Sequence, residues 1–360
     1  MRWSYLKSLL VLFVVIAGLI RCSPNTVEFD SLDNEEADDI SVQDIAEKHE
    51  NTPDQIEGKY ICTPLVSLEW GENSDQIGYL IEESTNKITG FHSPVFDENG
   101  KLYIPNPENN QIITLDNFEY ERSIPISESY VFKMGNQKFY WSQIGVANER
   151  IILKFSEFHD ERIVDRIAIL DLSGQVEKII NLEPYYPLHS IYTQAIKTDG
   201  YGGFYVNLDP MGIIHYDADF KSNLTYLGHD WNYGDSLIGW DKNLYYYNFQ
   251  DGHLTKWTSN GRRIAFKKDR PSIVLENIKK MGDMRSLIGV DEKGNIYILM
   301  NQNQEDYLLQ IDANGDLHRL GLEISPGFVN YFLDKAGNLY AFVYGYKDSE
   351  INPRIMKCEP

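Results

Sequence analysis

The sequence predicts an all-β protein in which six four-stranded sheets radiate around a common axis, a six-bladed β-propeller. Three observations support this prediction: strand-rich composition, a recurring turn phrase, and an incomplete last repeat. The 360 residues include 24 Tyr and 16 Phe, and apolar residues make up 42% of the chain. Aromatic residues favour strands, and a chain of this length can bury a large core.

The recurring phrase reads Asp-x-x-Gly-x-x-Tyr. Full copies begin at Asp97, Asp199, Asp291 and Asp334; a shortened copy begins at Asp241, and a degraded copy retains Tyr140. The six tyrosines follow one another at spacings of 37, 65, 40, 52 and 43 residues. These spacings are typical of one four-stranded propeller blade per repeat.

The residue types of the phrase predict a structural role. The Asp side chain can accept backbone N–H groups in a turn, and Gly tolerates a positive φ. The Tyr falls in the following strand, where its ring can pack between neighbouring sheets. We therefore expect the phrase to form the turn from the first to the second strand. A second turn, from the third to the fourth strand, is expected at Asp116, Asp171, Asp217, Asn260 and Asp312.

The sixth copy of the phrase lacks the second turn, so the last blade has three strands. The segment "YICTPLVSLEW", residues 60–70, has no first strand of its own and can supply the fourth. An antiparallel partner beginning near Tyr60 would place Cys62 beside Cys358. We expect a disulfide between them that locks the ring; two buried free thiols are the alternative.

The N-terminus predicts export. Residues 1–22 combine a basic head, a short apolar run and Cys22, as in a secretory signal. "GLIRC" resembles the lipobox of bacterial lipoproteins through Leu19, although Arg21 departs from it. This resemblance implies an acylated Cys22 and a lipid-anchored protein of the bacterial cell envelope. A cleaved secreted form and an uncleaved anchor are the alternatives.

Charge divides the rest of the chain. Residues 23–57 contain twelve acidic residues against one basic residue, Lys48, and are expected to form a disordered tether; residues 58–360 form the propeller. The formal net charge of -21 repels phosphate backbones, which disfavours nucleic-acid binding.

Residues 68–116 resemble the opening of NHL-type repeats. The matching residues are Gly71, Pro94, Asp97, Gly100 and Tyr103, whereas Pro105 and Asn106 replace the usual Asp. The second blade is divergent and contains a long insertion, "GVANERIILKFSEFHDERIVDR". The resemblance implies a six-bladed propeller of the TolB-like kind and says little about activity.

The expected ligand site is the mouth of the channel, where loops entering first strands meet loops joining second and third strands. Nine polar residues fall there: His92, Glu128, Gln194, Asp235, Arg285, Asn106, Asn207, Asn248 and Asn301. They could hold a polar ligand or a divalent cation through oxygen atoms. The alternative is a solvated rim where polar residues end strands.

No recognised catalytic motif stands in the sequence. The expected function is therefore a non-enzymatic, extracytoplasmic binding propeller without a cofactor, with a protein, peptide or glycan at its face and its lipid anchor in the membrane. An assembly subunit of a larger envelope complex is another possibility. The enzymatic alternative is a metal-dependent lactonase or hydrolase using channel carboxylates. By resemblance to gluconolactonase-like propellers, its metal would lie among Glu128, Asn207, Asn248 and Asp235.

Overall fold

The chain divides into two units, Met1–Glu50 and Asn51–Pro360. The computed structural model describes residues 56–360 except 79, 83–86, 90–92, 131, 135–136, 140, 142, 160–161, 183–192, 199–201, 209–211, 226–233, 250–251, 259–262, 265–277, 325–327 and 345–351. The predicted signal, Cys22 and nearly all of the tether lie outside the described residues. Within the described residues, no helix has both the length and the apolar character needed to cross a membrane.

Four sheets of the described chain are four-stranded antiparallel meanders. The first contains β4 (Val95–Phe96), β5 (Leu102–Asn106), β6 (Gln111–Asp116) and β7 (Glu119–Pro125). The second contains β10 (Gln143–Ala147), β11 (Arg150–His159), β12 (Arg162–Asp171) and β13 (Val176–Asn181). The third contains β14 (Thr193–Thr198), β15 (Phe204–Leu208), β16 (Gly212–Tyr216) and β17 (Ser222–Thr225). The fourth contains β18 (Gly234–Ile238), β19 (Leu244–Asn248), β20 (His253–Trp257) and β21 (Arg263–Ile264).

The last sheet has eight strands in the order β22-β23-β24-β25-β1-β28-β27-β26. One half is a meander of β22 (Asp283–Val290), β23 (Ile296–Gln302), β24 (Glu305–Ile311) and β25 (Leu317–Glu323). The other half consists of β26 (Phe328–Leu333), β27 (Leu339–Tyr344), β28 (Arg354–Glu359) and β1 (Gly58–Ser67). Strand β1 therefore joins two meanders edge to edge.

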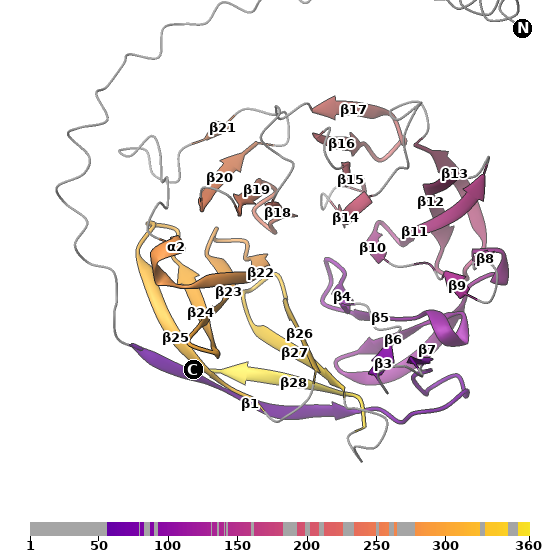
Figure 1. The fold of residues 1–360 in the computed structure, drawn as a ribbon. Coiled ribbons are helices and arrows are strands. Elements are labelled where there is room, and N and C mark those ends of the chain that lie inside the picture. The colour runs from indigo at the N-terminus through magenta and orange to yellow at the C-terminus, as the bar shows by residue number, and fades with distance from the viewer. Residues whose placement is uncertain are drawn as a thin grey trace, which may run out of the picture. The chain divides into compact units, whose positions relative to one another are not determined.

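The meanders surround a common centre, with β4, β10, β14, β18, β22 and β26 on the inside (Figure 1). Apolar clusters fill the spaces between neighbouring sheets. The ring also closes between its last and first meanders, because the Phe96 ring lies 5.6 Å from that of Phe332 and 5.2 Å from that of Tyr340. The predicted all-β propeller is confirmed.

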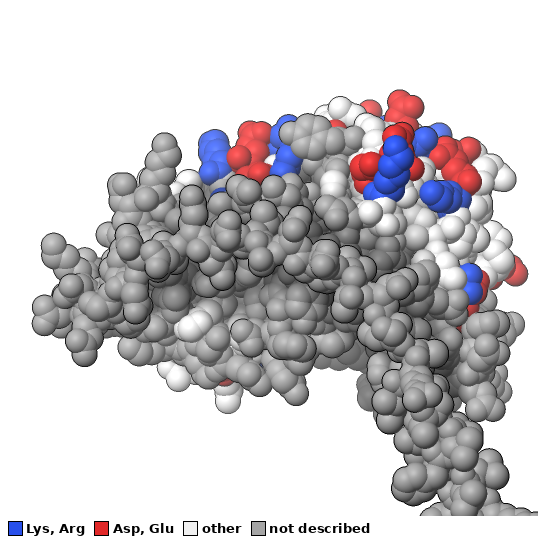
Figure 2. Space-filling model, turned by 90° about the horizontal axis from the view of Figure 1, so that it is seen from above, with Lys and Arg blue, Asp and Glu red and all other residues white. Residues whose placement is uncertain are grey.

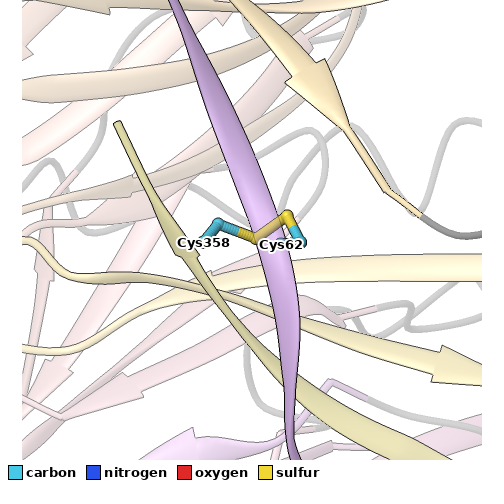
Figure 3. The surroundings of a disulfide bond; sticks show 2 residues. All are labelled: Cys62 and Cys358. Atoms are coloured by element: carbon cyan, nitrogen blue, oxygen red, sulfur yellow. A yellow bond between two sulfur atoms is a disulfide. The ribbon is translucent and has the colours of Figure 1, made fainter.

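The N-terminal strand completes the last meander as predicted. Strand β1 pairs antiparallel with β28, and Cys62 lies opposite Cys358. The two cysteines form the predicted disulfide (Figure 3). A feature that was not predicted is the parallel pairing of β1 with β25, from Gly58 opposite Leu320 to Ile61 opposite Glu323. The chain's first strand thus holds the edges of two sheets together.

The recurring phrase has the predicted structural role. Asp97 Oδ1 accepts the backbone N–H groups of Asn99 and Lys101, both at 2.9 Å. Gly100 has a φ of 85°, and the Tyr103 hydroxyl donates to Asp97 Oδ2 at 3.4 Å. Equivalent contacts recur at the later copies, where the hydroxyls of Tyr245 and Tyr340 donate to Asp241 and Asp334. Asp199 lies outside the described residues.

The second blade differs from the sequence prediction. Its first turn is not the degraded phrase at Tyr140, which lies outside the described residues, but the pair Asn148–Glu149, with φ values of 47° and 58°. Such a two-residue hairpin turn needs no Asp or Gly of the phrase. The supposed insertion supplies much of β10, β11 and β12 of this blade. A separate small hairpin, β8 (Phe132–Met134) and β9 (Gln137–Phe139), precedes them.

Candidate functional site: the upper rim and the channel

The candidate site lies at one end of the ring, where first strands begin and second strands end; we call this end the upper rim. Gln194, Asp235 and Arg285 lie near the starts of β14, β18 and β22. Four predicted amides lie near the ends of second strands: Asn106, Asn207, Asn248 and Asn301. The structure thus brings seven of the nine predicted residues to this rim. Their role in binding stays a prediction.

Asp235 is the carboxylate of this group. It is the second residue of β18 and is partly exposed. Its Oδ2 accepts the backbone N–H of Leu287 from β22 at 2.9 Å, which fixes the carboxylate orientation across two neighbouring sheets. Asn248 is 9% exposed and ends β19 opposite Gly234, one residue before Asp235. Asp235 itself pairs with Tyr247, so the side chains of Asp235 and Asn248 lie on opposite faces of this sheet, at the same end of it.

The adjoining sheets place further polar residues on the rim. Residues Thr193 and Ile196 of β14 pair with Leu208 and Val206 of β15, with a register shift between them. The backbone therefore carries Gln194 and Asn207 to the same end of this sheet. Their side chains lie outside the description.

A second irregularity presents Arg285. The register of β22 shifts between Met284 and Ser286, so Arg285 is the extra residue of a bulge, and it is exposed. Bulges of this kind redirect side chains and are frequent beside functional sites. On β23, Asn301 Nδ2 donates to Asp306 Oδ1 at 2.6 Å. The bulge thus exposes the positively charged side chain of Arg285 at this part of the rim.

Asn106 has a structural function. It is 1% exposed, its Oδ1 accepts the Gly78 N–H at 2.9 Å, and its Nδ2 donates to the Gln76 carbonyl at 2.8 Å. Both hydrogen bonds fasten the segment before β2 (Leu80–Glu82) and β3 (Lys87–Thr89) to the first meander. The amide of Asn106 is therefore engaged by the fold.

Glu128 does not begin a first strand as expected. It is exposed on the 3₁₀ turn η3 (Glu128–Tyr130), where the Tyr130 ring packs 4.7 Å from that of Phe155. The first strand of this blade instead begins at Gln143. The misplacement follows from assigning the blade's first turn to Tyr140. His92 lies outside the described residues.

The donor set of the upper rim has consequences for metal binding. Among the described residues, no group of three His, Cys, Asp or Glu side chains could hold a metal ion. The sequence-predicted set loses Glu128 and keeps one carboxylate, Asp235, together with amides. Such oxygen donors suit Ca²⁺ or Mg²⁺ and do not suit Zn²⁺.

Below the rim, apolar side chains predominate in the channel, together with backbone groups of the first strands, which are sheet edges. A cavity of about 100 Å³ is lined by residues from all six first strands and from the turn after β18. Leu237, Ile288 and Phe332 contribute to its wall, and Trp240 lies at the turn that ends β18. Thr198 is the one hydroxyl-bearing side chain among the described lining residues. The sequence analysis missed this cavity, although apolar runs such as "SLIGW" carried the signal.

Charges on the described surface are mixed. On the face shown in Figure 2, Lys and Arg side chains lie beside Asp and Glu side chains. Described ion pairs include Lys101 with Glu121 at 2.9 Å and Arg150 with Glu177 at 2.7 Å. Exposed ion pairs of this kind contribute little to the free energy of unfolding. They affect mainly the charge of the surface.

Comparisons with known proteins find similar folds among solved structures but assign the chain to no family. No family model and no curated protein match the chain. Solved structures similar to it include the following three. A luciferin-regenerating enzyme has 16% identity, covers 79% of this chain and 96% of its own, and has a TM-score of 0.46. Regucalcin, a calcium-binding protein from Agrobacterium tumefaciens, has 11% identity, coverage of 84% and 97%, and a TM-score of 0.46. A streptogramin B lyase has 13% identity, coverage of 75% and 93%, and a TM-score of 0.44.

These similarities correct one expectation. Several of the structurally similar proteins are enzymes by name, so the expected non-enzymatic binding function is contradicted. Identities this low identify no reaction. The class that fold and topology define is the β-propeller, and the narrower NHL-type or TolB-like assignment stays a prediction.

Proposed function

We propose that the protein is a hydrolase that binds an ester or lactone at the upper rim, with Asp235 as its central carboxylate. The observation that carries this proposal is the placement of Asp235. It is partly exposed at the start of β18, oriented by the Leu287 amide at 2.9 Å, and adjacent to the end of β19. Beneath it lies a channel lined mainly by apolar side chains, which can cover one side of a bound substrate.

The chain's own groups have distinct roles in this proposal. A carboxylate held in one orientation can accept a proton from a water molecule that attacks the ester carbonyl. The exposed guanidinium of Arg285 can bind the carboxylate formed by hydrolysis, because its N–H groups match carboxylate geometry. Asn248 supplies a buried amide that orients polar groups of the substrate. All three roles depend on hydrogen bonds or proton transfer that these side chains can make.

A divalent cation is part of the proposal. Asp235 would hold it through its carboxylate oxygens, the donor chemistry that Ca²⁺ prefers. A cation bound there would polarise the ester carbonyl and lower the pKa of bound water. Glu128 is not among the ligands, since η3 lies outside the first strands.

The test is hydrolysis of a panel of lactones and p-nitrophenyl esters by the intact protein with Ca²⁺ or Mg²⁺. We expect Asp235→Asn to lower kcat/KM by about 100-fold or more, as for loss of a general base. Glu128→Gln is the matched control and should retain wild-type activity. Chelation should lower activity, and added cation should restore it. A wild-type protein inactive on the whole panel would refute the proposal.

We also propose that the protein is exported and anchored through an acylated Cys22. A disulfide between Cys62 and Cys358 is compatible with an oxidising, extracytoplasmic compartment. Metabolic labelling with a palmitate analogue in a bacterial host should label the wild type and leave Cys22→Ser unlabelled. Equal labelling of both proteins, or of neither, would contradict the anchor.

A further inference from the structure

We propose that the channel cavity binds a short aliphatic chain, so that the substrate carries an alkyl or acyl tail of about three to five carbons. The proposal rests on the proposed hydrolase for the position of the polar head at the upper rim. The tail site itself rests on the cavity alone. It deepens the proposed function by naming the class of substrate: esters or lactones with an aliphatic side chain, in preference to a sugar lactone.

The strand geometry connects the rim to the cavity. Side chains two residues apart on a strand share one face, so Asp235 and Leu237 lie on the same side of β18. They pair with Tyr247 and Tyr245 of β19 in an unbroken register. Two residues span about 6.6 Å along a strand. A substrate head near Asp235 therefore has a cavity wall within reach of a chain of a few carbons.

The lining chemistry selects the occupant. Ile196, Leu237, Ile288, Phe332 and neighbouring apolar residues line the cavity. Cavities lined by apolar side chains bind small hydrocarbons, as an engineered cavity of 150 Å³ does. A volume of about 100 Å³ is smaller and fits a short unbranched chain.

Glycines keep the cavity walls in place. A Cβ on Gly239 would lie 2.7 Å from the Val290 Cβ, and one on Gly289 would lie 2.7 Å from the Leu333 Cδ1. Larger residues would push neighbouring first strands apart. The close approach of these strands limits the size of the cavity, so a branched chain, or one longer than about five carbons, should bind no better than an unbranched five-carbon chain.

The test measures binding of n-alkanols from ethanol to octanol to the intact protein, by calorimetry and by tryptophan fluorescence. Trp240 lines the cavity, so a bound chain should change its emission, and Trp240→Phe should abolish that change. We expect affinity to rise by about fourfold per methylene group and to level off near five carbons. Absence of saturable binding for every alkanol would overturn the proposal.

Two variants separate the cavity from the rest of the surface. Ile288→Phe enlarges a lining residue and should weaken pentanol binding by tenfold or more. Ile61→Phe makes the same change on β1, where Ile61 is 52% exposed, and should leave binding unchanged. If Ile288→Phe does not fold, Thr198→Ile narrows the same cavity. Unchanged pentanol binding in a folded Ile288→Phe or Thr198→Ile protein would contradict the assigned site.

Acyl-chain specificity distinguishes the two proposals. With both correct, kcat/KM should rise from acetyl to pentanoyl esters in the wild type, and Ile288→Phe should remove that rise. If alkanols bind but no ester is hydrolysed, the tail site stands and the hydrolase fails. If esters are hydrolysed without chain-length preference and no alkanol binds, the hydrolase stands and the tail site fails.

Discussion

Removal of the Cys62–Cys358 disulfide should lower the free energy of unfolding without opening the ring. The bond joins residues 296 apart in sequence, so it constrains the unfolded chain over nearly the whole propeller. The chain-entropy relation gives about 5.7 kcal/mol at 25 °C for a loop of this length. Strand β1 still pairs with β25 and β28 in the reduced protein, so we expect a folded but less stable ring.

Urea unfolding measures this effect. With a slope of about 3 kcal/mol per molar urea for a large chain, a loss of about 5.7 kcal/mol moves the midpoint by about 1.9 M. The double variant Cys62→Ala/Cys358→Ala should show this shift, and a reducing agent should produce it in the wild type while leaving the variant unaffected. A change below about 1 kcal/mol would refute the reasoning that the bond constrains the unfolded chain.

Two further predictions concern the blade turns and pH. Gly337→Ala should lower the thermal unfolding midpoint more than Gly100→Ala: both glycines have φ near 85–88°, but an added Cβ would meet Asp291 Oδ2 at 2.7 Å only at Gly337. The positive φ alone costs about 1–2 kcal/mol, and equal midpoints in both variants would contradict the contact. Burial, with a smaller effect of Asp306, raises the pKa of Tyr331 from 10 to about 12. Its stabilising contribution is complete below pH 10 and is lost as pH rises towards 12. Tyr331→Phe should therefore lose less stability over this range in pH-dependent urea unfolding, and an identical loss in both proteins would count against it.

Much of the fold could be predicted because local residue types imposed it. The turn at Asp97 needs an Asp, a Gly and a Tyr at fixed spacing, so its repetition marks successive sheets. Ring closure followed from a missing strand, and Cys358 falling opposite Cys62 followed from antiparallel pairing. The parallel pairing of β1 with β25 could not be predicted from the sequence, because the composition of a strand does not identify the strand with which it pairs.

The site was less predictable for physical reasons. The hairpin turn at Asn148–Glu149 forms without the phrase, so counting back from Tyr140 placed Glu128 wrongly. The role of Asn106 depends on a contact with Gly78, 28 residues away, which no local pattern reports. Asp235 lies at the start of β18, where counting back from the phrase at Asp241 placed it, and its role in binding stays a prediction. The apolar channel arises only when six strands converge.

The comparison of Asp235→Asn with wild type in ester hydrolysis tests the central claim most directly. A propeller whose catalytic carboxylate is Asp235 should lose about 100-fold or more in kcat/KM while keeping its alkanol affinity and its urea midpoint. An Asp235→Asn protein as active as the wild type would place the chemistry elsewhere and contradict the assignment of the upper rim.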